Sequence, residues 1–230
     1  MCRDKRLLVA PRALALAVLF GACALVSFGI AAQQTPAVAS DTPADTDSGA
    51  GAQSASGPEA RDVVSGLVAA LEAAAASAVD SQLRFEQLLP VVRSSHDLPF
   101  IAQLTIRRQW RDMSANDRAD FVAAFEALST MTYATRFEGL SEGSFRVLES
   151  ALLDEGRVEV ATEIVREDGD PVPIEFLLQI DDEGDPRIIN IVADGVSDLA
   201  LKRAQYQRVF REGGSVADLI ESIEAETAGL

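Results

Sequence analysis

Residues 97–133 read DLPFIAQLTIRRQWRDMSANDRADFVAAFEALSTMTY, and this stretch decides the fold. Its apolar residues are large, closely spaced and spread more widely than the single packing stripe of an ordinary surface helix. It contains almost no side chain suited to catalysis. A helical block of this kind fits a protein that encloses an apolar molecule better than one that makes or breaks bonds.

The stretch contains two helix starts. Asp97 is a suitable N-cap, and Pro99 falls in the first turn, where its missing N–H costs nothing. Ser114 is the next N-cap, with Asp117 three residues later as a weak capping box. These signals predict two helices, the second of which ends near Gly139.

Helical patterns also lie on both sides of this block. Residues 61–79 carry apolar side chains at helical spacing, and residues 83–92 form a shorter helical element that Pro90 bends or ends. Two further helices, 199–210 and 216–224, close the chain.

Between the helical parts the apolar pattern changes to the alternation of strands. Short turns rich in Asp, Glu and Gly separate the alternating segments, as in an antiparallel meander with one wet face. The predicted fold is α+β: a curved four-stranded antiparallel sheet packed against several helices, with an apolar cavity between the layers. The predicted strands are 144–153, 157–166, 174–180 and 187–192.

The N-terminal segment has the features of an export signal. Residues 1–31 combine basic residues, an apolar run over 13–30 and small residues at the exit, which is typical of a cleaved secretory signal peptide. An uncleaved membrane anchor is an alternative, because the run is just long enough to span a bilayer. Cys23 allows a second alternative, a lipoprotein, although the apolar run continues past it. We expect a periplasmic protein.

The rest of the chain divides into a tether and a domain. Residues 32–59 are rich in Ala, Ser, Thr, Pro, Gly and Asp and predict a disordered linker. Residues 60–230 predict a single folded domain of ordinary size, with room for an apolar core. Cleavage near Ala31 would remove both cysteines and leave 16 basic and 35 acidic residues, a net charge of about −19. So acidic a chain repels nucleic acid and anionic membrane surfaces at long range, so nucleic acid is excluded as a partner.

Few residues are suited to catalysis or metal binding. His96 is the only histidine, and no phosphate-binding loop, dinucleotide fingerprint or nucleophile elbow is present. His96 is expected to be a solvent-facing loop residue; alternatively it pairs with Asp97 or another carboxylate as an acid–base dyad. The acidic clusters at 167–170 and 181–185 lack the spacing of a calcium loop and are interpreted as hairpin turns. No cofactor or metal is expected.

Two segments resemble the MlaC family of periplasmic phospholipid carriers, also called the toluene-tolerance or ABC-transporter auxiliary family. The first is DLPFIAQLTIRRQW followed by FVAAFEAL and Tyr133; the second is DGVSDLALKRAQYQRVFREGGSVADLIESI, residues 194–223. The sequence of the first segment is most similar to that of MlaC-family members found beside hopanoid-biosynthesis genes. One position departs from the family: Arg107 stands where members usually have Gly, so it must point outward or the helix must sit differently.

The resemblance implies a soluble, non-catalytic shuttle. It would hold the acyl chains of one glycerophospholipid between sheet and helices, with a hopanoid as another possible cargo. Its partners would be an outer-membrane lipoprotein complex and an inner-membrane MCE-domain ABC transporter. From the family's layout, the residues expected to line the pocket or border its mouth are Phe100, Leu104, Trp110, Phe121, Phe125, Phe176, Leu178, Ile191, Val196 and Tyr206.

Two other classes of function remain open at this point. One is a small curved-sheet enzyme, such as an isomerase or dehydratase, that uses His96 and Asp97. The other is a non-catalytic adaptor in a hopanoid-linked membrane complex. Each large aromatic residue taken alone is also compatible with an ordinary filled core.

Overall fold

The computed structural model describes residues 50–77, 80–137, 140, 143–153, 156–165 and 170–230. The chain divides into two compact units, 1–35 and 36–230, and all described residues belong to the second. The predicted signal peptide, Cys23 and most of the predicted tether lie outside the described residues. None of the helices in the described part is long and apolar enough to cross a membrane.

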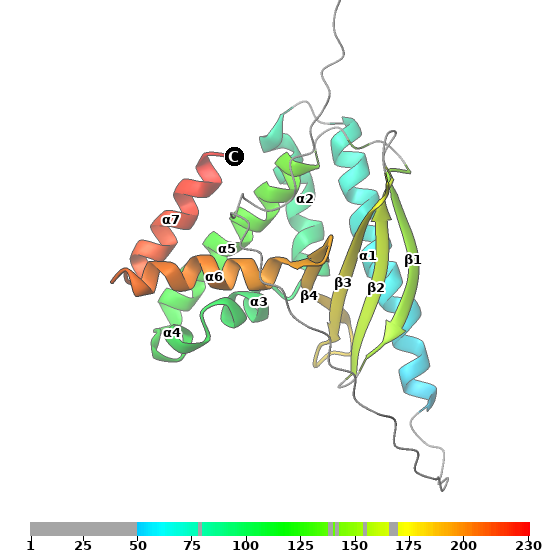
Figure 1. Cartoon of the computed structure of the whole chain (residues 1–230), viewed down its shortest axis with the longest axis horizontal. Coiled ribbons are helices and arrows are strands. Elements are labelled where there is room, and N and C mark those ends of the chain that lie inside the picture. Colours follow the sequence, from blue (N-terminus) through cyan, green and yellow to red (C-terminus); the bar gives the residue numbers. More distant parts are fainter. Residues whose placement is uncertain (1–49, 78–79, 138–139, 141–142, 154–155, 166–169) are drawn as a thin grey trace, which may run out of the picture. The chain divides into compact units, whose positions relative to one another are not determined.

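The sheet is an antiparallel meander in which each strand pairs with the next along the chain (Figure 1). This confirms the predicted order and direction of the four main strands. A fifth strand of two residues also joins the sheet, but it is too short to produce an alternating pattern in the sequence. The strands are β1 (Phe145–Leu152), β2 (Arg157–Ile164), β3 (Val172–Ile180), β4 (Pro186–Ala193) and β5 (Val196–Ser197).

One face of the sheet is buried. Along β2, half-buried and buried residues alternate, and the buried Val158 and Val160 lie opposite Leu178 and Phe176 of β3. Helix α1 (Ala50–Ser77) contacts β1, β2, β3 and β4 and runs behind the strands in Figure 1. The helix therefore covers the face on which these side chains lie.

Helix α1 begins earlier than its apolar pattern indicated. The buried stripe of Val64, Leu67 and Leu71 agrees with the predicted helix, but the helix starts at Ala50, inside the segment interpreted as a tether. Alanine is the strongest helix former, so an Ala-rich segment can be helical once it has a surface to pack on. The sheet supplies one: a methyl group at Gly57 would stand 3.4 Å from Ser150 Oγ of β1.

Helix α2 (Ser81–Ser95) continues past Pro90, so the prediction that Pro90 ends this element is wrong. A proline in a helix removes one hydrogen bond and crowds the preceding turn. Leu88 and Val92 lie on either side of Pro90 and are both buried, whereas Pro90 is exposed. Packing of the two apolar side chains offsets the local cost, and the helix continues.

Three helices form the block that was expected to contain two. Asp97 and Ser114 act as N-caps, as predicted, through bonds from the N–H groups of Phe100 and Asp117. The extra boundary is Ile106, whose φ of −128° and ψ of 38° are not helical. Arg107 follows it and is exposed, so it points outward. The helices are α3 (Leu98–Thr105), α4 (Arg107–Asp112) and α5 (Ala115–Arg136).

The helices after the sheet complete a second apolar layer. Helix α6 (Asp198–Arg211) packs on α3 and on β4, and α7 (Val216–Ala228) packs along α5. A cluster of buried side chains from α2, α3, α5, α6 and α7 also includes Ile189 of β4. The described part of the chain thus has one apolar layer between the sheet and α1 and another among the remaining helices, on the β4 side of the sheet (Figure 1).

Candidate functional site

His96 lies at the junction of α2 and α3, where the chain also meets the sheet. Its backbone N–H donates to Val92 O at 3.1 Å, and the N–H of Asp97 donates to Ile188 O of β4 at 3.0 Å. His96 is only 7% exposed, so the prediction of a solvent-facing loop residue is wrong. The sequence held a signal for this: His96 follows Leu88 by eight residues and Val92 by four, which places it on the buried face of α2.

The hydrogen bonds of His96 define its tautomer. Ser95 Oγ donates to Val91 O at 2.7 Å, so the same oxygen accepts from His96 Nδ1, 2.8 Å away. His96 Nε2 then has no proton and accepts from the Tyr133 hydroxyl at 2.9 Å. Burial lowers the pKa of His96 to about 4, so the imidazole is neutral at pH 7.

This arrangement does not form the acid–base dyad that was considered. The Asp97 carboxylate accepts from the Phe100 N–H at 3.0 Å and caps α3. No hydrogen bond or ion pair joins it to His96 within the described residues, and both nitrogens of the imidazole already have partners. His96 is therefore a buried bridge between α2 and α5, and the dyad interpretation is wrong.

Four of the predicted lining residues come together in the helical layer. Phe121 and Phe125 of α5 and Tyr206 of α6 are buried members of its apolar cluster, and Trp110 of α4 packs against it. The ring centroids of Phe121 and Tyr206 are 6.0 Å apart, those of Phe121 and Phe125 are 6.4 Å apart, and those of Trp110 and Phe121 are 6.5 Å apart. These rings form a continuous aromatic wall across three helices.

The other predicted residues near this wall are less buried. Phe100 is half-buried and packs on the same cluster, and Leu104 is half-buried at the end of α3. Val196 is 37% exposed and is not part of the cluster.

Tyr206 of the aromatic wall is 1% exposed, and its hydroxyl has no hydrogen-bond partner among the described residues.

The predicted residues on the strands form a separate group. Phe176 and Leu178 are buried, and Ile191 lies directly opposite Phe176 in the register of β3 and β4. They share the face that α1 covers, and none of the three belongs to the helical cluster. The structure therefore divides the predicted lining between two apolar layers, and its contact with a lipid stays a prediction.

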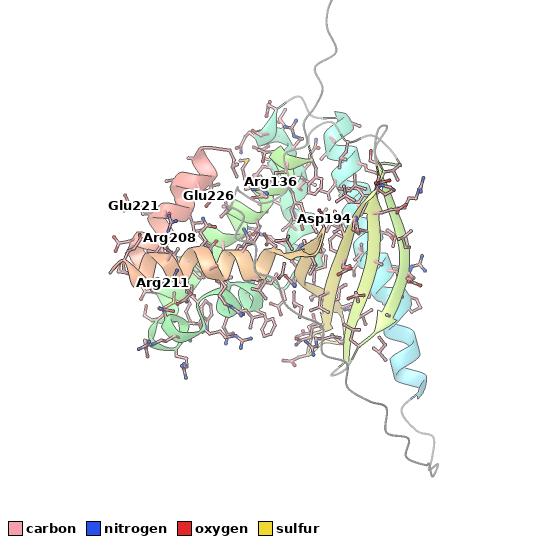
Figure 2. The ribbon with its side chains drawn as sticks, viewed as in Figure 1. Arg136, Asp194, Arg208, Arg211, Glu221 and Glu226 are labelled. Atoms are coloured by element: carbon pink, nitrogen blue, oxygen red, sulfur yellow. The ribbon has the colours of Figure 1, made fainter. Side chains whose placement is uncertain are left out.

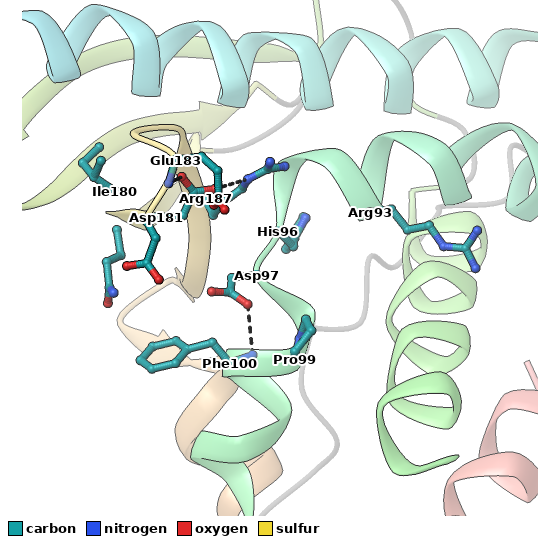
Figure 3. A pocket seen from close by; sticks show the side chains of 11 residues that line it. Arg93, His96, Asp97, Pro99, Phe100, Ile180, Asp181, Glu183 and Arg187 are labelled. Carbon is teal, nitrogen blue, oxygen red and sulfur yellow. Dashed lines mark hydrogen bonds and ion pairs between the residues drawn. The ribbon is translucent and has the colours of Figure 1, made fainter. Parts of the chain in front are cut away.

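A polar pocket of about 480 Å³ opens beside the start of α3 (Figure 3). His96, Asp97 and Phe100 lie on one side, and the turn between β3 and β4 forms the other. Arg187 Nε donates to Asp181 Oδ2 at 3.0 Å across the base of this turn. Because charged side chains dominate its lining, this pocket does not suit acyl chains.

The acidic turn itself is held by its own carboxylate. Asp181 Oδ1 accepts from the backbone N–H groups of Glu183 at 3.1 Å and Asp185 at 2.7 Å, which confirms the interpretation of 181–185 as a turn. The described residues contain no group of three or more His, Cys, Asp or Glu side chains arranged to hold a metal ion. Most of the other acidic cluster, 167–170, lies outside the described residues.

Two cationic side chains, one buried and one half-buried, were not expected from the sequence. Arg84 is buried on α2, and its Nε donates to Ala134 O at 2.5 Å. Lys202 Nζ lies 5.7 Å above the centroid of the Phe125 ring, and its side chain is 14% exposed. Helical spacing held the signal in both cases, because Arg84 precedes Leu88 by one turn and Lys202 precedes Tyr206 by one turn.

Comparison with known proteins identifies relatives of this fold. No curated protein sequence matches the chain. Among solved structures, the phospholipid-binding protein from Ralstonia solanacearum, determined in complex with a phospholipid, matches with a TM-score of 0.65 at 16% identity, covering 76% of this chain and 97% of that chain. At this identity the likeness shows a shared fold. The sequence model of the MlaC protein family matches residues 61–225, which is nearly all of the described domain, so the chain belongs to the MlaC family of non-catalytic lipid-binding carriers.

Proposed function

We propose that this protein is a periplasmic carrier that binds a glycerophospholipid by its acyl chains. It would move the lipid between the outer and inner membranes for an MCE-type ABC transport system. The observation that carries the proposal is the match of the MlaC family over residues 61–225. The fold supports it, because the similar Ralstonia protein was solved with a phospholipid.

The apolar layers supply what such a ligand requires. Burial of one 16-carbon acyl chain contributes about 12 kcal/mol, at ~0.8 kcal/mol per CH₂. Most of this binding comes from apolar area, so the carrier needs no catalytic group. We propose the aromatic wall of Phe121, Phe125, Tyr206 and Trp110 as one side of the acyl-chain site. Phe176, Leu178 and Ile191 would extend the site toward the sheet if the two layers part around the lipid.

Burial of this extent also has a kinetic consequence. A ligand held by two buried acyl chains leaves slowly unless the protein opens. The carrier is therefore expected to release its lipid when a transport complex opens it. The outer-membrane lipoprotein complex and the inner-membrane transporter are the proposed partners for loading and release.

Lipid extraction tests the proposal. The protein is purified from the periplasm without detergent, extracted with organic solvent and analysed by mass spectrometry against a mock purification that lacks the protein. We expect glycerophospholipid in stoichiometric amount only with the protein. A protein that is repeatedly empty, and that also fails to take up added phospholipid after refolding, would overturn the proposal.

The same extract separates the other candidates. A hopanoid in place of phospholipid would show that the carrier function is right and the cargo class is wrong. An adaptor without cargo would be empty and would still bind its membrane complex. Binding of the protein to its proposed membrane complex is therefore measured twice, with the lipid-loaded and with the delipidated protein.

A further inference from the structure

Basic residues gather on two helices of an otherwise acidic chain. The chain has 20 Lys and Arg against 36 Asp and Glu, a net charge of −16. Helices α4 and α6 together hold seven of these basic residues and only two acidic ones, Asp112 and Asp198. The local charge on this pair of helices is therefore opposite in sign to that of the whole chain.

The two helices lie beside each other. Gln207 Nε2 of α6 donates to Gln109 Oε1 of α4 at 3.3 Å, and Arg203 Nε donates to Leu104 O, just before α4, at 3.1 Å. Arg203 and Arg211 lie one turn before and one turn after Gln207, on the same face of α6. Figure 2 shows Arg211 at the end of α6 that lies away from the sheet. Six arginines of these helices are exposed, and Arg208 is paired with Glu212. We call the other five the basic surface: Arg107, Arg108, Arg111, Arg203 and Arg211.

No ion pair within the described residues involves this surface. The two other basic residues of α6 are paired, Lys202 with Asp198 at 3.9 Å and Arg208 with Glu212 at 3.6 Å. None of the five arginines of the basic surface forms an ion pair with a described residue, and Arg203 uses its Nε on a backbone carbonyl.

Stability of the helices does not account for the arginines at the start of α4. Arg107 and Arg108 are the first two residues of α4, where the positive end of the helix dipole disfavours cations. Arg107 and Arg111 are four residues apart, a spacing at which like charges repel. Arg111 and Arg211 lie in the last turns of α4 and α6, where the helix dipole favours cations, so helix stability accounts for these two and not for Arg107, Arg108 and Arg203. Exposed arginines that have no ion pair within the described chain point to a partner outside it.

We propose that the basic surface binds the headgroup layer of an anionic phospholipid bilayer. Guanidinium groups match phosphate oxygens with paired hydrogen bonds, and arginines near an anionic leaflet each add to the attraction. Strong protein interfaces bury their anchor residues, arginine included, in desolvated pockets that surrounding contacts seal from water. The large exposed apolar residues of the described chain all lie outside α4 and α6, at Leu83, Leu148, Leu152, Leu153, Val196 and Leu230.

The acidic remainder of the chain does not prevent this contact. At physiological ionic strength charges are screened beyond about 8 Å, so the membrane responds to the nearest face and not to the net charge. Repulsion of the acidic faces then leaves the basic surface as the favoured side of approach. The inference goes beyond carriage of a lipid, because it assigns a membrane-facing side and holds whether or not the protein is loaded.

Vesicle co-sedimentation of the purified protein tests the inference. The protein is mixed with vesicles of phosphatidylcholine alone, or of phosphatidylcholine and phosphatidylglycerol in equal parts, at low and physiological salt. The basic-surface variant carries R107Q, R108Q and R111Q. The control carries R61Q, R136Q and R146Q, which remove the same charge from exposed arginines outside the basic surface. Arg146 pairs with Glu163 at 2.9 Å, so thermal unfolding of the control checks that loss of this ion pair leaves the fold intact. Arg136 is far from the basic surface, because it is the last residue of the 22-residue helix α5, whose first residue follows α4 (Figure 2).

We expect the protein and the control to bind the phosphatidylglycerol vesicles, more weakly as salt rises, and not the phosphatidylcholine vesicles. The basic-surface variant should bind them more weakly by on the order of a hundredfold. Absence of binding to anionic vesicles, or equal binding by variant and control, would overturn the inference; so would cross-linking of the basic surface to an acidic protein without vesicle binding. Lipid extraction from both variants distinguishes failure of this inference from failure of the proposed carrier function. If the protein does not carry lipid, both variants are empty, and the difference in vesicle binding between them is unchanged.

Discussion

His96 joins the end of α2 to α5 in its neutral form. The imidazole accepts from Tyr133 and donates to Ser95, so protonation would place a second donor against the Tyr133 oxygen. Burial opposes the same protonation, because it removes the charged form from water. Both effects favour the neutral ring, and this residue therefore links the stability of the fold to pH.

The lowered pKa of His96 predicts a loss of stability in acid. The native pKa is about 4 against a model-peptide value of 6.5, so below pH 6.5 the unfolded chain binds a proton that the native chain does not. Stability from this group is present above pH 6.5 and is lost as the pH falls to about 4, by about 3 kcal/mol in total.

Two measurements check this prediction. His96 is the only histidine, so its NMR signals can be followed without overlap, and we expect a midpoint near pH 4. Urea unfolding of the H96Q variant, which keeps every carboxylate, should show a weaker pH dependence between pH 7 and 4. A midpoint near 6.5, or the same pH dependence in both proteins, would contradict it.

Tyr133 and Tyr206 are expected to respond differently to loss of their hydroxyl groups. Tyr133→Phe leaves His96 Nε2 buried without a donor, which should cost about 1–3 kcal/mol of unfolding free energy. Tyr206→Phe removes a buried hydroxyl that has no partner among the described residues, so stability should stay the same or rise. Urea midpoints of the two variants give the comparison; equal destabilisation would show that the hydroxyls have equivalent partners.

At the scale of elements, helix caps predict a measurable share of stability. Ser215 and Asp218 form a reciprocal capping box at the start of α7, with bonds of 3.2 Å and 2.7 Å. Ser215→Ala should lower the free energy of unfolding by about 1 kcal/mol, because α7 buries Leu219 and Ile223 against the rest of the helical layer.

The same helix contains the matched control for this prediction. Ser222 is exposed in the middle of α7 and makes no hydrogen bond with a described residue. Ser222→Ala should leave stability unchanged or raise it slightly, because Ala favours helix. Thermal unfolding of the two variants should therefore move in different directions, and a shared shift would reject the role of the cap.

The elements that were predictable are those with a complete local signal. Alternation along β2 and the caps at Asp97 and Ser114 each follow from a few neighbouring residues. The break at Ile106 has no glycine or proline to mark it, and the fully buried Ile106 side chain shows that it is fixed by tertiary packing. The start of α1 was missed because its composition also suits a tether until the sheet is present.

The candidate site was predictable as a set of residues and not as an arrangement. Phe121 and Phe176 look alike in the sequence, since both are large apolar residues at regular spacing. One belongs to the helical layer and the other to the layer beneath α1. That division arises because the later helices pack on the β4 side of the sheet. This is a long-range tertiary contact, and the spacing of apolar residues within one element does not predict it.

At the scale of the whole molecule, the proposed acyl-chain site and the basic surface lie in different places. The aromatic wall belongs to the inside of the helical layer, whereas the basic surface lies on the outside of α4 and α6. Trp110 connects the two, because it belongs to α4 and packs against Phe121. It is the only tryptophan of the chain, so its fluorescence reports this one position.

Quenching of Trp110 by brominated lipid tests whether the aromatic wall borders the acyl chains. Bromine quenches tryptophan only at short range. The delipidated protein, free of vesicles, is loaded with phosphatidylglycerol brominated in mid-chain or with the unbrominated lipid as control. If the acyl chains lie against the wall, the brominated lipid should reduce the fluorescence substantially and the control should not. Equal fluorescence, with equal loading shown by extraction, would place the chains in the other layer, beneath α1 against Phe176 and Leu178. In that case the helical aromatic residues would be a filled core.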